Sequence, residues 1–174
     1  MKTLYLVRHA KSTWEYPSLA DYDRPLNNRG LRDAPLMGQR LADKKISVDQ
    51  IWSSPARRAI DTTYILAEAL NYSRKEIMLH DQFYISSTDN FISEIQSCPD
   101  EVKSLLIVGH NPVICQSANL LIADDNSDAD IELMPTCSIV AIEFNICSWS
   151  QLREHEGRCL FFDYPKKNDI FIEI

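Results

Sequence analysis

The chain has little glycine, no long apolar run at its start and no closely spaced pair of cysteines. Only 4 of its 174 residues are glycine, and no repeat or glycine- and serine-rich linker marks a domain boundary. We therefore predict a single domain over residues 1–174, long enough to bury its own core. The first apolar run, Thr3–Val7, is too short for a signal peptide or a membrane span. The sequence thus predicts a cytoplasmic protein with no membrane partner.

Basic residues are also fewer than acidic ones. The chain has 18 Lys and Arg and 25 Asp and Glu, which gives a net charge of −7. An acidic chain repels polyanions, so we expect no nucleic-acid partner. The 5 cysteines are odd in number and widely spaced, which favours free thiols over disulfides or a zinc site. The acidic stretch 123–130 lacks the glycine and the final glutamate of a calcium loop and predicts a solvated loop. We expect no metal and no cofactor.

Two apolar segments of the chain each end in a histidine. Residues 3–7 run into Arg8 and His9, and residues 104–109 run into His110. Short apolar runs rich in β-branched residues predict buried strands. In open α/β sheets, ligands bind beyond the carboxyl ends of such strands. A histidine after a strand is often only a surface residue, but two such strands predict that both histidines meet over one site.

The order of predicted elements indicates the fold class. Strands are expected at 3–7, 50–53, 77–79 (followed by an apolar segment at 83–85) and 104–109. Helices are expected from Asn27 or Asn28 to Lys44, from Pro55 to Leu70, from Thr88 or Asp89, and from Pro112. Pro35 is expected to bend the first helix or to delay its start. Residues 138–144 and 158–162 predict a terminal antiparallel pair. The sum is an α/β three-layer sandwich: a mostly parallel central sheet with antiparallel additions and helices on both faces.

A third strand end supplies further arginines. Residues 50–53 run into Ser54, Pro55 and the pair Arg57 and Arg58. Arginine presents planar, paired donors that match phosphate and stays charged at physiological pH. Arginines and two histidines at converging strand ends therefore predict a pocket for an anion with several oxygens.

In this order the motifs resemble those of the histidine phosphatase (phosphoglycerate mutase-like) superfamily. Its opening motif, a strand ending in Arg-His-Gly or Arg-His-Ala, is similar to Leu6–Ala10. Its Ser-Pro-x-x-Arg-Ala-x-x-Thr motif is matched by Ser54–Thr62, in a register that makes Arg58 the phosphate ligand. The third motif is Val108–Pro112.

Over nearly the whole chain, the sequence more closely resembles the short SixA-type phosphohistidine phosphatases. Asp21–Gly30 looks like their D-x-x-R-P-L-x-x-x-G segment, and Met134–Ser138 looks like their Pro-Thr-Cys/Ala segment. Members of this group also commonly have a proline near Pro35. The mutases carry longer insertions over the site, so the resemblance implies a small, open pocket.

The resemblance implies a catalytic role for each motif residue. His9 is the expected nucleophile, since a neutral imidazole attacks phosphorus without a metal. Arg8, Arg58 and a protonated or donor-presenting His110 are expected to hold the phosphate oxygens, with help from backbone N–H groups around Asn111. Lys11 and Ser12 are candidates for the entrance or for solvated loop residues.

The proton donor stays open between two carboxylates. The superfamily usually supplies one after its third strand, where Asp81 lies, whereas the SixA-type group has an aspartate at the position of Asp21, which we slightly favour. Departing imidazole needs less help than an alcohol, because protonation of its far nitrogen lets it leave as a neutral ring. His80 and His155 lie in no motif and are interpreted as surface residues.

The resulting hypothesis is a metal-independent phosphatase that acts through a phosphohistidine on His9. Its expected substrate is phosphohistidine in a partner such as a phosphotransfer domain. The alternatives are a phosphatase for small phosphomonoesters and a non-catalytic phosphate-binding module. Retention of Arg8, His9, Arg58 and His110 argues against the binding module, because a binder does not need the nucleophile.

Overall fold

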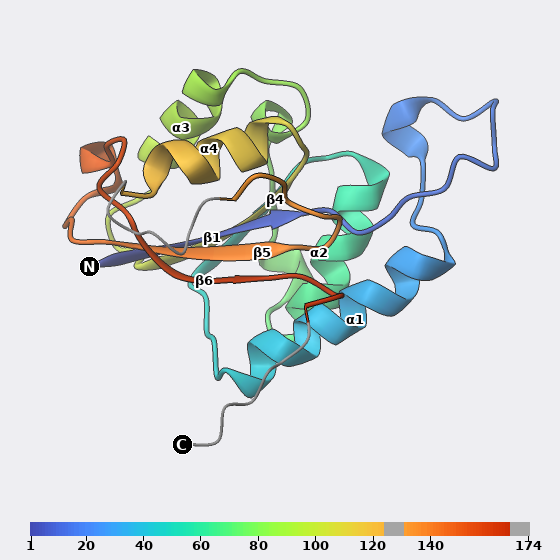
Figure 1. The fold of residues 1–174 in the computed structure, drawn as a ribbon, viewed down its shortest axis with the longest axis horizontal. Helices are drawn as coiled ribbons and strands as arrows, with labels where there is room; N and C mark the ends of the chain where they lie inside the picture. The colour runs from blue at the N-terminus through green and yellow to red at the C-terminus, as the bar shows by residue number, and fades with distance from the viewer. Residues whose placement is uncertain (124–130, 168–174) are drawn as a thin grey trace.

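A six-stranded mixed sheet forms the centre of the protein (Figure 1). The computed structural model describes residues 1–123 and 131–167, so most of the predicted acidic loop lies outside the described residues. The strands are β1 (Lys2–Arg8), β2 (Gln50–Ser53), β3 (Met78–Leu79), β4 (Ser104–Gly109), β5 (Ile139–Phe144) and β6 (Arg158–Asp163). Their order across the sheet is β3-β2-β4-β1-β5-β6.

The first four strands of the chain are parallel and the last two are antiparallel. β1 pairs with β4, β4 with β2, and β2 with β3, all in parallel. β5 runs antiparallel to β1, and β6 antiparallel to β5. The predicted mostly parallel sheet with antiparallel additions is confirmed. The carboxyl ends of β1, β2 and β4 consequently lie at one edge of the sheet.

Helices cover both faces of the sheet and bury two separate cores (Figure 1). α1 (Asn28–Asp43) and α2 (Arg57–Ala69) lie on one face, and α3 (Thr88–Gln96) and α4 (Val113–Leu121) on the other. Because side chains alternate along β1, Tyr5 and Val7 enter the core with α1 and α2, while Leu4 and Leu6 enter the other core. The three-layer prediction is confirmed. No helix in the described part of the chain is long and apolar enough to span a membrane.

The first helix begins where the sequence predicts. The side chain of Asn27 accepts a hydrogen bond from the Gly30 backbone and caps α1. A Cβ atom at Gly30 would collide with the Lys11 carbonyl oxygen, so glycine allows α1 to pack against the chain that follows His9. Pro35 lies inside the helix at an exposed position. Pro35 therefore does not delay the helix start.

Two other boundaries differ from the predicted ones. Helix α2 begins at Arg57 rather than at Pro55, because residues 54–56 continue in an extended or turn conformation after β2. Strand β3 has only two residues, and a 3-10 turn, Asp81–Phe83, follows it; of the apolar segment 83–85, Phe83 ends this turn and the next two residues lie in a turn and a bend. The 3-10 turn places Phe83 in the core against Phe91.

Candidate active site

The two motif histidines meet because their strands are neighbours in register. β1 and β4 pair in parallel with Arg8 opposite Gly109, and the backbone N–H of His9 donates to the Gly109 carbonyl at 3.0 Å. His110 follows directly. The rings of His9 and His110 lie 4.8 Å apart between centroids, tilted by 53°. The predicted convergence of the strand ends is therefore present in the structure.

His9 is held as a neutral imidazole whose Nε2 carries no proton. Its Nδ1 is 2.7 Å from the carbonyl oxygen of Ala10, which fixes the proton on Nδ1. Nε2 accepts a hydrogen bond of 3.3 Å from Nε of Arg58. Burial is the main cause that lowers the pKa of His9 to about 3; the hydrogen bond with the Ala10 carbonyl opposes it, and the charges of the nearby arginines act in the same direction as burial. The ring is therefore neutral at physiological pH.

The ring of His110 lies beside that of His9 and contacts Ser54. Its Nε2 is 2.8 Å from Oγ of Ser54, which also accepts from the Ala56 backbone N–H. With the Ser54 hydroxyl hydrogen assigned to Nε2, the proton of the ring lies on Nδ1. Nδ1 is buried and has no hydrogen-bond partner among the described residues. Burial, then the interaction with the neighbouring His9 ring and the charge of Arg58, lower the pKa of His110 to about 2, so the neutral form predicted as donor-presenting is favoured over the protonated one.

The second motif places Arg58 inside and Arg57 outside. Arg58 lies in the first turn of α2 with a side chain only 7% exposed, and its Nε donates to His9. Arg57 is 61% exposed and forms an ion pair with Asp61 one helical turn away. The side chain of Thr62, the last residue of the motif, accepts from the Ala10 backbone at 3.0 Å and so ties α2 to the residue after His9.

A segment from the far end of the chain positions Arg8 and Asn111. The carbonyl of Met134 accepts from Nη1 of Arg8 at 2.7 Å and from Nδ2 of Asn111 at 3.1 Å. The backbone N–H of Cys137 donates to the carbonyls of Arg8 and His9. Nε of Arg8 is buried without a partner among the described residues. The segment that resembles the Pro-Thr-Cys/Ala motif therefore orients both side chains and leaves a guanidinium donor for a ligand.

Asp21 lies in the site and links three side chains. Its Oδ1 accepts from Nη2 of Arg24 at 2.6 Å, and its Oδ2 accepts from Nη2 of Arg58 and from the Tyr84 hydroxyl, both at 3.0 Å. Burial raises the pKa of Asp21, but hydrogen bonds from Arg24 and Tyr84 and the charge of Arg58 outweigh it and lower the pKa to about 2. Asp21 is thus an ionised carboxylate in this arrangement.

Sequence reasoning did not single out Arg24 and Tyr84 as functional residues. Arg24 belongs to the D-x-x-R-P-L segment, and this motif was the available signal for it. Its guanidinium is buried, donates to Ser12, and stacks on the ring of Trp14 at 3.5 Å from the centroid. Tyr84 lies in no motif, and only the fold brings its hydroxyl to Asp21.

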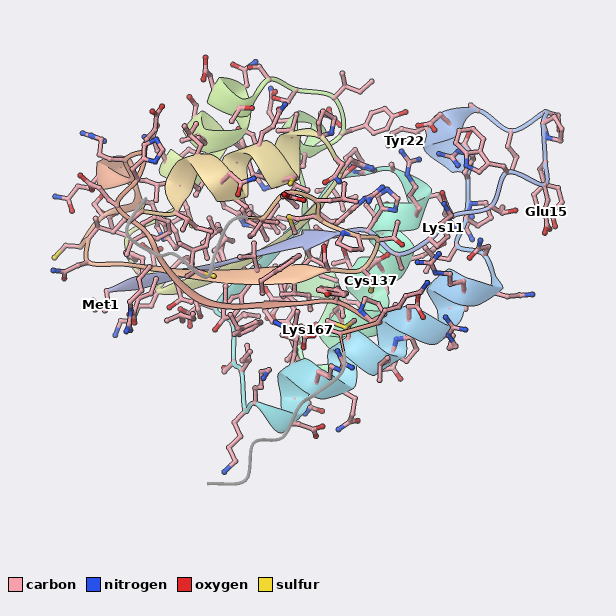
Figure 2. All side chains as sticks on the ribbon, in the orientation of Figure 1. Met1, Lys11, Glu15, Tyr22, Cys137 and Lys167 are labelled. Atoms are coloured by element: carbon pink, nitrogen blue, oxygen red, sulfur yellow. The ribbon has the colours of Figure 1, made fainter. Side chains whose placement is uncertain are left out.

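A cavity of about 260 Å³ lies at the carboxyl edge of the sheet. Arg24 lines it, whereas Asp21 contacts its wall through Arg24 and Arg58, and the Tyr84 hydroxyl contacts Asp21. Its walls include Arg8, His9, Arg58, His110 and Asn111. Lys11 and Ser12 line it too, as does Trp14, whose side chain is 71% exposed. Figure 2 shows Lys11, Tyr22 and Cys137 at the end of the sheet remote from Met1, with Glu15 at the tip of the projecting loop.

The other sequence-selected residues lie elsewhere. Asp81 is exposed in the turn after β3 and does not line the cavity. His155 is exposed, as expected for a surface residue. The interpretation of His80 as a surface residue is wrong: its ring stacks on Trp52 at 4.3 Å, and its Nδ1 lies 2.5 Å from a carboxylate oxygen of Glu94. Sequence alone does not reveal this stack, because the two rings come from different strands.

The cysteines are free thiols, and none joins the cavity wall. Cys137 lies in the segment whose backbone contacts Arg8 and His9. Burial raises the pKa of its thiol to about 12, so this thiol stays protonated. Within residues 1–123 and 131–167, no group of three or more His, Cys, Asp or Glu side chains is placed to hold a metal ion.

The sequence of the chain matches a family model and curated relatives. The model of the histidine phosphatase superfamily (branch 1) matches residues 4–83. A relative from Mycobacterium leprae, itself an uncharacterized protein, is 31% identical over 170 residues, which are 92% of this chain and 100% of the relative.

Solved structures with the name SixA share the fold over almost the whole chain. The SixA protein of Agrobacterium tumefaciens is 28% identical, with a TM-score of 0.79 over 94% of this chain and 98% of that one. The protein histidine phosphatase SixA complexed with tungstate is 19% identical, with a TM-score of 0.78 over 94% of this chain and 97% of that one. The six-stranded sheet and its four helices are therefore the phosphoglycerate mutase-like α/β fold.

Proposed function

Because the chain belongs to the histidine phosphatase superfamily, with a fold of the SixA type, we propose that it is a phosphatase that removes phosphate from phosphohistidine in a partner protein. Family membership supports a histidine-based phosphatase. The choice of phosphohistidine rests on one observation in particular: the only carboxylate that reaches the phosphate ligands, among the residues described, is ionised.

In the first step, Nε2 of His9 attacks phosphorus. The Ala10 carbonyl keeps the proton on Nδ1, and burial keeps the ring neutral, so Nε2 needs no prior deprotonation; it gives up its hydrogen bond from Arg58 as it attacks. A bond forms between Nε2 and phosphorus while the bond between phosphorus and the substrate imidazole breaks. Water then attacks the phosphorylated His9, which releases inorganic phosphate and restores the free ring.

Charge on the transferring phosphoryl group is held by donors that are already in place. Nε of Arg8 and Nδ1 of His110 are buried donors without partners among the described residues, and Arg58 lies against the nucleophile. Preorganised donors of this kind are the main source of acceleration in phosphoryl transfer. We assign Arg8, Arg58 and His110 to the phosphate, with Asn111 at the edge of the same cavity.

The site differs from one that cleaves alcohol esters in how the leaving group can be protonated. An alkoxide needs a proton as it departs, but Asp21 has a pKa of about 2 and is held between two arginines, and Asp81 lies outside the cavity. An imidazole protonated at its far nitrogen leaves as a neutral ring without a protein acid. The site therefore suits phosphohistidine better than a sugar or glycerol phosphate.

The rim of the cavity also suits a protein substrate. The loop between β1 and α1 exposes three aromatic side chains, Trp14, Tyr16 and Tyr22, and Trp14 reaches the cavity wall. Exposed aromatic residues beside a reactive site are typical of surfaces that contact a protein partner. Small phosphomonoesters remain the second candidate, because a cavity of about 260 Å³ also holds a small ester.

The test is a comparison of turnover with and without a chelator. A phosphotransfer domain phosphorylated on histidine is compared with a panel of sugar phosphates, nucleotides and aryl phosphates. We expect the largest kcat/KM with the phosphohistidine protein and no effect of the chelator. Higher kcat/KM for a sugar phosphate would favour the small-ester function, and phosphate binding without any turnover would favour a binding module.

A further inference from the structure

In this site Arg58 contacts a carboxylate of the protein and is also expected to bind the phosphate of the substrate. Its Nη1 donates to the backbone oxygen of Asp21 at 2.6 Å, and its Nη2 donates to Oδ2 of the same residue at 3.0 Å. Its Nε donates to His9. Three of the five guanidinium N–H groups are therefore engaged before any phosphate arrives.

The carboxylate of Asp21 accepts a hydrogen bond from Arg58, as a phosphate oxygen would. Besides Arg58 it accepts from Arg24 through two nitrogens and from the Tyr84 hydroxyl. A dianionic phosphate bound to the remaining N–H groups of Arg58 would lie beside this negative charge on the same guanidinium. Like charges that share one site repel each other strongly, so Asp21 and phosphate compete for Arg58.

We propose that Asp21 is a positioning residue that takes the place of a phosphate oxygen on Arg58 when no phosphate is bound and yields this contact when phosphate binds. The proposal takes from the proposed function only that the ligand is a phosphate. Asp21 keeps Arg58 paired and oriented between turnovers, since a buried unpaired guanidinium is costly. By competing, it also promotes departure of the product phosphate.

The surroundings of Asp21 allow it to move. Its side chain is 47% exposed, whereas those of Arg24 and Arg58 are 9% and 7% exposed. It lies in the short turn Asp21–Asp23, none of whose own residues is buried, and the turn contacts the buried arginines through Asp21. Displacement of Asp21 from Arg58 therefore moves an exposed carboxylate and leaves the two buried arginines in place.

The experiment measures binding of inorganic phosphate to the purified protein by calorimetry, without any turnover. Asp21→Asn keeps the shape of the side chain and removes its charge, and we expect it to bind phosphate about 5- to 30-fold more tightly. Tyr84→Phe removes one donor to the carboxylate and is expected to tighten binding by about 2- to 3-fold. Merely structural damage would weaken binding instead.

Asp23→Asn is the matched control. Asp23 lies in the same turn and is exposed, and its carboxylate has no hydrogen bond or ion pair within the described part of the chain. The same charge is removed there, and we expect phosphate affinity to change less than about 2-fold. Unchanged or weaker binding by Asp21→Asn, or equal tightening by Asp23→Asn, would overturn the proposal. Absence of turnover with every substrate would instead refute the proposed function and leave this binding result intact.

Discussion

Replacement of Arg58 by lysine is the sharpest test of the site, because the chain offers a matched control one residue away. In the structure Arg58 donates from all three of its nitrogens, to Nε2 of His9 and to Asp21, from a nearly buried position. A lysine ammonium is a point charge and does not reproduce this planar fork. Each hydrogen bond to a charged group contributes about 1.5–3 kcal/mol. Loss of two such bonds to the transferring phosphoryl group is expected to lower kcat/KM by about 10²–10⁴-fold.

Arg57→Lys is the control, because its side chain is exposed and pairs only with Asp61 on the surface of α2. Exposed ion pairs contribute about 0.2–1 kcal/mol, and lysine retains the charge, so we expect kcat/KM within about 2-fold of the wild type. The assay is steady-state turnover of the same phosphohistidine protein by both variants, with circular dichroism to check folding. A larger loss for Arg57→Lys than for Arg58→Lys would refute the assignment of the phosphate ligand.

Three further outcomes are expected. His9→Ala should fold and yet lose turnover, and rapid quench of the wild type should trap acid-labile, base-stable phosphate; turnover near the wild-type rate would rule out His9 as nucleophile. Asp81→Asn should leave kcat/KM for phenyl phosphate within about 2-fold, whereas loss of a general acid would cost about 10²–10⁴-fold. Because burial lowers the pKa of His9 to about 3, the unfolded state binds more protons below about pH 6.5. The free energy of unfolding should therefore fall as pH drops from about 6.5 towards 3, with His9 contributing up to about 1.4 kcal/mol per pH unit, and His9→Gln should have a shallower slope in chemical denaturation.

The elements that define the site follow from local sequence signals. Strands β1 and β4 are apolar runs that end abruptly in charged or polar residues, so both histidines were placed at the sheet edge correctly. The helix cap at Asn27 is likewise a local signal. The burial of Arg58 and the exposure of Arg57 agree with the register of the second motif.

What the sequence did not show are contacts between distant segments. Arg58 and Asp21 are 37 residues apart, and Tyr84 is 63 residues from Asp21, and no periodicity or spacing links them. His80 is interpreted as a surface residue because it lies in no motif, and its stacking on Trp52 of β2 is a contact between distant segments that leaves no local signal. Proline alone does not mark a helix boundary in this chain. Pro35 lies inside α1 on an exposed face, whereas Pro55 precedes the first residue of α2.

The register between β1 and β4 has a consequence for how sequences with this fold can diverge. His9 and His110 owe their separation to backbone hydrogen bonds between paired strands, not to the shapes of the side chains packed beneath them. Exchange of one apolar residue for another in either core leaves that register unchanged, because it preserves the alternation of faces. The relative position of the two histidines is thus unaffected by apolar substitutions in the core. A protein such as SixA of Agrobacterium tumefaciens accordingly shares the architecture while differing at most positions.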